Sequence, residues 1–167
     1  MDAAPATTSY DFAAAPAEAY RLLVRDLAAL LQGERDMIAN AANCSALLFH
    51  ALPNLNWAGF YFQRGDSLVL GPFQGRPACV RIAQGQGVCG RAAATRTTQR
   101  VEDVHAFPGH IACDAASNSE LVVPLLTRAG RLVGVLDLDS PMLGRFQPLD
   151  QQGIEALAAV WLSASDC

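Results

Sequence analysis

The sequence lacks any apolar run that approaches the ~20 residues a membrane-spanning helix requires, so no membrane insertion is expected. Charged residues make up only 17% of the chain, the formal net charge is -4, and no basic stripe is present. Nucleic acids and anionic membrane surfaces are therefore not expected as partners. Hydrophobic residues amount to 51%, which is typical of a compact globular chain.

The first twenty residues lack both the positively charged start and the apolar stretch of a secretory signal, so we expect a cytoplasmic protein. Residues 1–16 are rich in Ala, Pro and Thr and are expected to be a flexible lead-in to a single domain at 17–167. In a reducing compartment, the five cysteines indicate catalytic, metal-binding or core residues rather than a disulfide framework.

The pattern of apolar residues predicts helices at both ends of the chain and strands between them. Apolar residues recur with the 3.6-residue period of a helix at 17–31, 34–52 and 149–162. Strands are expected at 57–63, 68–70, 79–82, 121–127 and 132–139, with a short helix at 85–94. Because hairpins join most strands, we expect an α+β fold: a central antiparallel sheet of about five or six strands with the terminal helices packed on one face.

A long polar loop at 101–120 is the segment most typical of a functional site. It carries two histidines, several carboxylates and Cys113, and a Pro-Gly pair interrupts it. A thiolate is the reactive form of cysteine, and a nearby imidazolium lowers the pKa that governs its formation. His105 and His110 could provide that charge. Most single cysteines are inert core residues, but this polar context favours a reactive Cys113.

Carboxylates cluster on the expected strands that follow the loop. Asp137 and Asp139 alternate along one strand, so both face the same side of the sheet, and Glu120 begins the neighbouring strand. Two like charges near a core are unfavourable unless a cation joins them. Three interpretations stay open: a solvent-exposed strand end, a site for a substrate ammonium group, and a metal site.

A metal is the least favoured of these interpretations, and none is expected. Ca²⁺ or Mg²⁺ would need more oxygen ligands than three carboxylates provide, and the spacing of the His and Cys residues matches no zinc motif. The aromatic strand at 57–63 must direct part of its side chains to the carboxylate face. Trp57 is the best candidate for an apolar wall there.

Five segments together resemble the free methionine-(R)-sulfoxide reductases, which are small enzymes built on a GAF domain. The segments are NWAGFY (56–61), LVLGPFQGRPACVRI (68–82), GQGVCGRAAAT (85–95), VEDVHAFPGHIACDAASNSELVVPL (101–125) and GVLDLDSP (134–141). Three cysteines, each in its own local motif, make the resemblance specific. It implies a single GAF domain over 17–167.

The resemblance implies a role for each of three cysteines. Cys113 corresponds to the attacking cysteine and Cys79 to the resolving cysteine, while Cys89 corresponds to a third cysteine that shares or replaces the resolving role. The Cys113 thiolate would attack the sulfoxide sulfur and become a sulfenic acid, which a second thiol converts to a disulfide. Thioredoxin would then reduce the disulfide as the external reductant, and no bound cofactor is expected.

The resemblance also implies the pocket for free L-methionine-(R)-sulfoxide, including its stereochemistry. Glu120, Asp137 and Asp139 correspond to carboxylates that hold the amino group of the amino acid. Trp57 corresponds to the aromatic side chain against the S-methyl end, and Tyr61 lines the same pocket. GAF domains often dimerise through their terminal helices, so a homodimer is open. The alternatives are a non-catalytic GAF sensor of a small ligand and a thiol redox switch.

Overall fold

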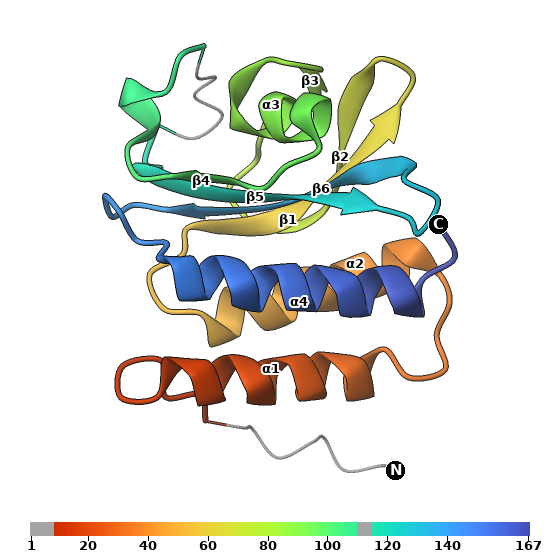
Figure 1. Ribbon diagram of the computed structural model, residues 1–167, viewed down its shortest axis with the longest axis vertical. Helices are drawn as coiled ribbons and strands as arrows, with labels where there is room; N and C mark the ends of the chain where they lie inside the picture. The colour runs from red at the N-terminus through yellow and green to blue at the C-terminus, as the bar shows by residue number, and fades with distance from the viewer. Residues whose placement is uncertain (1–8, 110–114) are drawn as a thin grey trace.

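The structure of the protein, a computed structural model, describes residues 9–109 and 115–167. Within these residues the centre of the fold is an antiparallel six-stranded sheet in the order β3-β2-β1-β6-β5-β4 (Figure 1). The strands are β1 (Trp57–Arg64), β2 (Ser67–Gly75), β3 (Arg81–Ala83), β4 (Gln99–Val101), β5 (Ser119–Leu126) and β6 (Leu132–Ser140). The helices are α1 (Pro16–Leu30), α2 (Met37–Ala51), α3 (Gly87–Thr95) and α4 (Pro148–Ala164), with the 3-10 turn η1 (Val104–Ala106).

The sheet separates two layers of unequal thickness. Helices α2 and α4 pack on one face, α1 lies outside them, and α3 lies on the opposite face (Figure 1). The helical face holds the larger core, in which Phe60, Leu136 and Trp161 are fully buried. This arrangement confirms the expected α+β fold with the terminal helices on one face. No helix in the part of the chain described here is long and apolar enough to cross a membrane.

Strand alternation decides which residues reach the α3 side of the sheet. Trp57 pairs with Asp139 across the β1–β6 ladder, and Glu120 pairs with Asp139 across the β5–β6 ladder. Because directly paired residues point to the same face, these side chains share the α3 side, together with Asp137. The residues between them, such as Leu138, are directed into the helical core.

Several boundaries differ from the sequence predictions. Helix α2 begins at Met37 rather than at 34, because the Asp36 carboxylate accepts hydrogen bonds from the N–H groups of Ile38 and Ala39 and so caps the helix. Strand β3 starts at Arg81 rather than at 79, which leaves Cys79 in the connection that precedes it.

Strand β2 is longer than the predicted strand at 68–70 and continues to Gly75. The register shifts between Gly59 and Tyr61 on β1, and one extra residue of β2 is accommodated there as a bulge that includes Pro72. A bulge tolerates proline within a strand because the ladder hydrogen bonds are already interrupted. The Gly-Pro pair, which usually ends a strand, therefore lies inside one.

Candidate active site

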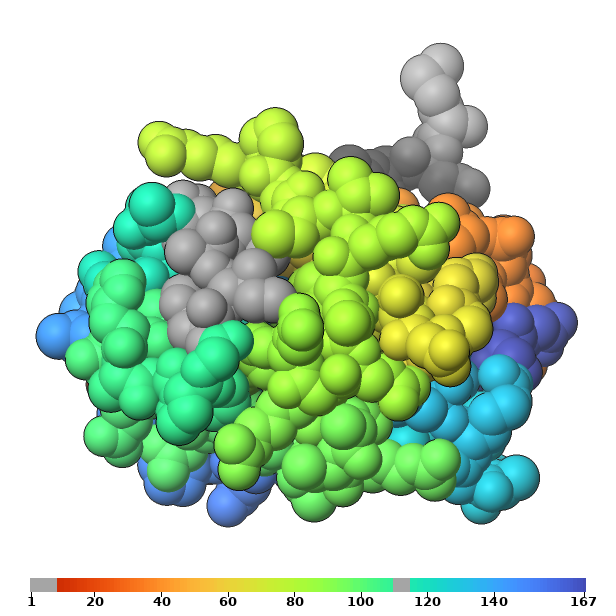
Figure 2. Space-filling model, turned by 90° about the horizontal axis from the view of Figure 1, so that it is seen from above, coloured from red at the N-terminus to blue at the C-terminus, as the bar shows by residue number. Residues whose placement is uncertain are grey.

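The carboxylates lie between the sheet and α3, on the face that Figure 2 shows from outside. There α3 and the chain between β2 and β3 form much of the surface over the middle of this face (Figure 2). Glu120 and Asp137 are 7% and 5% exposed, and Asp139 is half-buried. The sheet therefore holds two carboxyl groups out of water on neighbouring strands. This excludes the interpretation of a fully solvated strand end.

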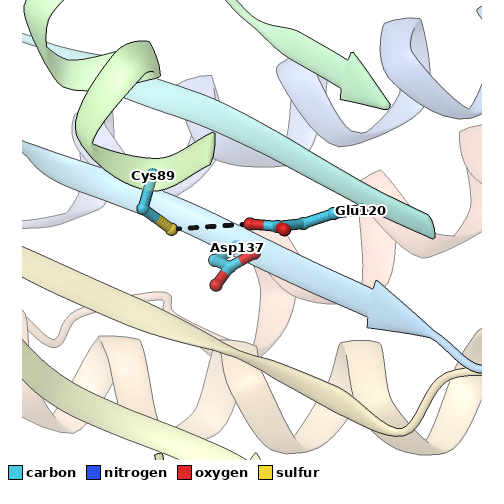
Figure 3. Close-up of side chains that lie close together, drawn as sticks. All are labelled: Cys89, Glu120 and Asp137. Atoms are coloured by element: carbon cyan, nitrogen blue, oxygen red, sulfur yellow. Dashed lines mark hydrogen bonds between the residues drawn. The ribbon is translucent and has the colours of Figure 1, made fainter. Parts of the chain in front are cut away.

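The thiol of Cys89 completes this cluster from the first turns of α3. Its Sγ donates a hydrogen bond to Glu120 Oε1 over 3.8 Å (Figure 3). Among the described residues, Cys89 Sγ and one carboxylate oxygen each of Glu120 and Asp137 lie within 4.8 Å of one another, so these three residues could together hold a cation. Asp137 Oδ1 is buried and has no hydrogen-bond partner.

Burial controls the protonation of the cluster. It raises the pKa of Glu120 well above the ordinary value, and the charges of Asp137 and Asp139 raise it further. Burial also raises the pKa of Asp137 to about 7, against the opposing effect of hydrogen bonds with Cys89 and Glu120. The pKa of Cys89 is raised well above that of an ordinary thiol, again mainly by burial. A bound cation would reverse these effects, since an opposite charge favours the ionised carboxyl groups.

An aromatic wall stands beside the carboxylates. The Trp57 ring stacks on Tyr61 at a centroid distance of 5.8 Å and on Phe73 at 5.2 Å. Its indole N–H donates to the carbonyl oxygen of Arg76 over 3.1 Å, which fixes the ring orientation. Gly59 makes this packing possible, because a Cβ there would lie 2.4 Å from Phe73 Cβ and 2.7 Å from Trp57 Cη2. Sequence reasoning missed Phe73, which lies in the part of β2 beyond the predicted strand at 68–70.

The cysteines have four different environments. Cys79 is half-buried and disulfide-bonded in the β2–β3 connection, and its carbonyl oxygen accepts a 3.0 Å hydrogen bond from the Tyr61 hydroxyl. Cys89 is a buried free thiol, and Cys167 is an exposed one. Cys44 is a buried free thiol in the helical core. Cys113 and His110 lie outside the described residues.

The chain on either side of residues 110–114 is hydrogen-bonded to segments that also carry candidate site residues. On the N-terminal side, the carbonyl of Gly109 accepts from the N–H of Gly87, at the start of the helix that carries Cys89. On the C-terminal side, the Asn56 amide donates to Ser117 Oγ over 3.1 Å. His105 is exposed and bonds Asn118 Oδ1 through Nε2 at 2.9 Å.

Comparison with known proteins places this site in a family. The GAF domain model matches residues 15–160. The free methionine-R-sulfoxide reductase of Escherichia coli is 56% identical over 142 residues, which cover 85% of this chain and 86% of that protein.

Solved structures agree with that match. A putative GAF sensor protein from Burkholderia vietnamiensis is 60% identical with a TM-score of 0.87, covering 89% of this chain and 94% of that one. The free methionine-R-sulfoxide reductase of Neisseria meningitidis, solved in complex with its substrate, is 41% identical with a TM-score of 0.88, covering 96% and 94%. The chain therefore belongs to the GAF-domain family and, within it, to the free methionine-R-sulfoxide reductases.

Proposed function

We propose that the protein reduces free L-methionine-(R)-sulfoxide to L-methionine by a thiol-dependent mechanism. The observation that carries this proposal is the buried pair of Glu120 and Asp137, with an unpartnered Asp137 Oδ1, beside the Trp57 wall. A zwitterionic amino acid with an apolar methyl end matches both features. The name of the Escherichia coli relative and the substrate complex of the Neisseria meningitidis relative support the same substrate.

The carboxylates would select the free amino acid through its ammonium group. Glu120, Asp137 and Asp139 lie on neighbouring strands and face one side of the sheet. The ammonium group donates up to three hydrogen bonds and compensates the buried negative charge. A methionine sulfoxide residue within a peptide brings a neutral amide instead. The ion pairs with the carboxylates could then not form, which would cost about 3–5 kcal/mol of binding free energy.

The reductive step would take place at Cys113. Its thiolate attacks the sulfoxide sulfur, the oxygen ends on the cysteine as a sulfenic acid, and methionine leaves. The Cys79 thiol then attacks the sulfenic sulfur, forming a Cys79–Cys113 disulfide and releasing water. This requires the two Cα atoms to come within about 7 Å. An external dithiol, for which thioredoxin is the expected donor, reduces the disulfide by exchange and is itself oxidised.

Cys79 is the better candidate than Cys89 for the resolving role. Cys89 is buried, its thiol bonds Glu120, and its raised pKa keeps it protonated. A protonated thiol is a poor nucleophile. Cys79 is half-buried and disulfide-bonded, which fits a residue that takes part in thiol–disulfide exchange.

Thiol titration separates the proposed enzyme from the two alternatives. The reduced protein is treated with methionine-(R)-sulfoxide without an external reductant, and free thiols and free methionine are counted. The proposal expects two thiols to disappear for each methionine formed. A ligand sensor would keep all its thiols, and a redox switch would lose thiols without producing methionine. Either result would contradict the proposal.

A further inference from the structure

Three donor atoms from three separate elements converge between α3 and the sheet. Cys89 comes from α3, Glu120 from β5 and Asp137 from β6, and Figure 3 shows their side chains directed toward one another. Their thiol and carboxylate ligand atoms lie within 4.8 Å of one another, and the residues are 4%, 7% and 5% exposed. The unpartnered Oδ1 of Asp137 is a second observation, because a buried carboxylate oxygen without a donor is available to a cationic or hydrogen-bonding ligand.

We propose that Cys89, Glu120 and Asp137 bind a divalent transition-metal ion of the zinc class, and that this ion and the substrate's ammonium group exclude each other. The exclusion rests on the proposed function, because the same two carboxylates are assigned to the ammonium group there. The metal would thus inhibit the enzyme reversibly by occupying the substrate-binding carboxylates.

The donor set selects this class of ion. Zinc binds thiolate sulfur at about 2.3 Å and carboxylate oxygen at about 2.0–2.2 Å in tetrahedral geometry, which sets its donors about 3.5 Å apart. Cys89 Sγ and Glu120 Oε1 are already 3.8 Å apart, so small side-chain rotations suffice. Three protein ligands leave a fourth position for water. Ca²⁺ and Mg²⁺ require more oxygen ligands, and thiolate favours softer ions.

Charge explains why a metal competes with an ammonium group. When a dication binds, Cys89 and the protonated carboxyl groups of the cluster release their protons to solvent, and no oxidant or reductant is needed. The dication then compensates more of the resulting negative charge than an ammonium does. The sequence spacing gave no metal motif, because residues 89, 120 and 137 come together only through the packing of α3 on the sheet.

The test uses Co²⁺ as a spectroscopic substitute for Zn²⁺. Protein reduced with a phosphine and freed of metal with a chelator is titrated with Co²⁺ while the thiolate-to-cobalt absorption band is followed. Wild-type protein is expected to show the band, Cys44→Ala and Cys167→Ser to keep it, and Cys89→Ser to lose it. Zn²⁺ affinity, measured against a colorimetric chelator, should fall in Cys89→Ser by at least the roughly 10- to 100-fold that loss of an outer-shell partner costs. Circular dichroism establishes that each variant is folded, and Cys89→Ala provides a second thiol-free variant.

The outcomes that overturn the proposal are distinct from those that overturn the enzymatic function. Absence of the band in wild-type protein, or a band that survives in Cys89→Ser and disappears in Cys79→Ser, would remove the metal site. Methionine-(R)-sulfoxide should titrate the band away, and Zn²⁺ should raise KM without lowering kcat. A band that persists at saturating amino acid would overturn the exclusion. A protein that shows the band when loaded with Co²⁺ but fails to reduce the sulfoxide after the metal is removed would overturn the proposed function alone.

Discussion

Trp57 on β1 lies directly opposite Asp139 on β6, so the aromatic wall and the carboxylates of the site meet at one cross-strand pair. The pairing of β1 with β6 sets the distance between these two residues, and no loop contributes to it. A ligand that touches both must therefore carry its charge and its apolar end close together. Methionine sulfoxide as a free amino acid meets this condition.

Replacing Asp137 with Asn should lower kcat/KM by roughly 10²- to 10³-fold, mainly through a higher KM, since a neutral amide cannot balance the ammonium charge. Steady-state kinetics with free methionine-(R)-sulfoxide measures the change. Asp66→Asn, an exposed carboxylate in the β1–β2 turn, is the matched control and should leave both constants unaltered. An unchanged KM in Asp137→Asn would argue against the ammonium site.

The two tryptophans of the chain provide a matched pair of substitutions. Trp57→Phe removes the hydrogen bond to the Arg76 carbonyl and should cost about 0.5–1.5 kcal/mol of stability, and it should also raise KM because the wall loses area. Trp161→Phe alters only the helical core and should lower stability while KM per folded molecule stays the same. Denaturant unfolding and kinetics on both variants test this. Equal effects on KM would place Trp57 outside the pocket.

The stability of the substrate-free, metal-free protein should decline as the pH rises from ~4 to about 7 through the contribution of this cluster. In the unfolded chain Glu120 and Asp137 lose their protons near pH 4, whereas burial raises their pKa in the fold. The folded state therefore holds more protons in this window, and the free energy of unfolding falls as the pH increases. Asp139 also raises the pKa of Glu120, whereas hydrogen bonding with Cys89 lowers the pKa of both carboxyl groups. Burial and then the nearby carboxylates raise the pKa of Tyr61, which also faces the cluster.

Denaturant unfolding at several pH values, with wild type and Asp137→Asn compared side by side, isolates this contribution. The variant should gain stability relative to wild type as the pH rises, and methionine sulfoxide should flatten the wild-type curve. A difference between the two proteins that does not depend on pH would show that Asp137 titrates normally.

Substitution of Cys113 and of Cys79 should separate the reduction of the sulfoxide from the recycling of the enzyme. Cys113→Ser should abolish formation of methionine, because the nucleophile is gone. Cys79→Ser should still release one methionine per protein in a single turnover and then stop with a sulfenic acid at Cys113, detectable by trapping with dimedone. Cys44→Ala is the control for loss of a thiol in the core. Continuous turnover by Cys79→Ser with thioredoxin would assign the resolving role to Cys89.

The sequence was sufficient where strand alternation governs the outcome. Asp137 and Asp139 were predicted to share a face, with Glu120 on the neighbouring strand, and the β5–β6 register confirms both relationships. Alternation could not reveal the contact of Cys89 with Glu120, because it depends on how α3 crosses the sheet. Phe73 was missed for a local reason: the Gly-Pro pair before it indicated a break, while the bulge opposite Phe60 lets β2 continue.

The hydrogen bond from the Tyr61 hydroxyl to the Cys79 carbonyl links the cysteine backbone to a ring stacked on Trp57. In a Trp161→Phe variant, Trp57 is the remaining tryptophan, and Tyr61 alone separates it from the Cys79 backbone. The fluorescence of Trp57 should therefore report oxidation and reduction at Cys79 without an added dye.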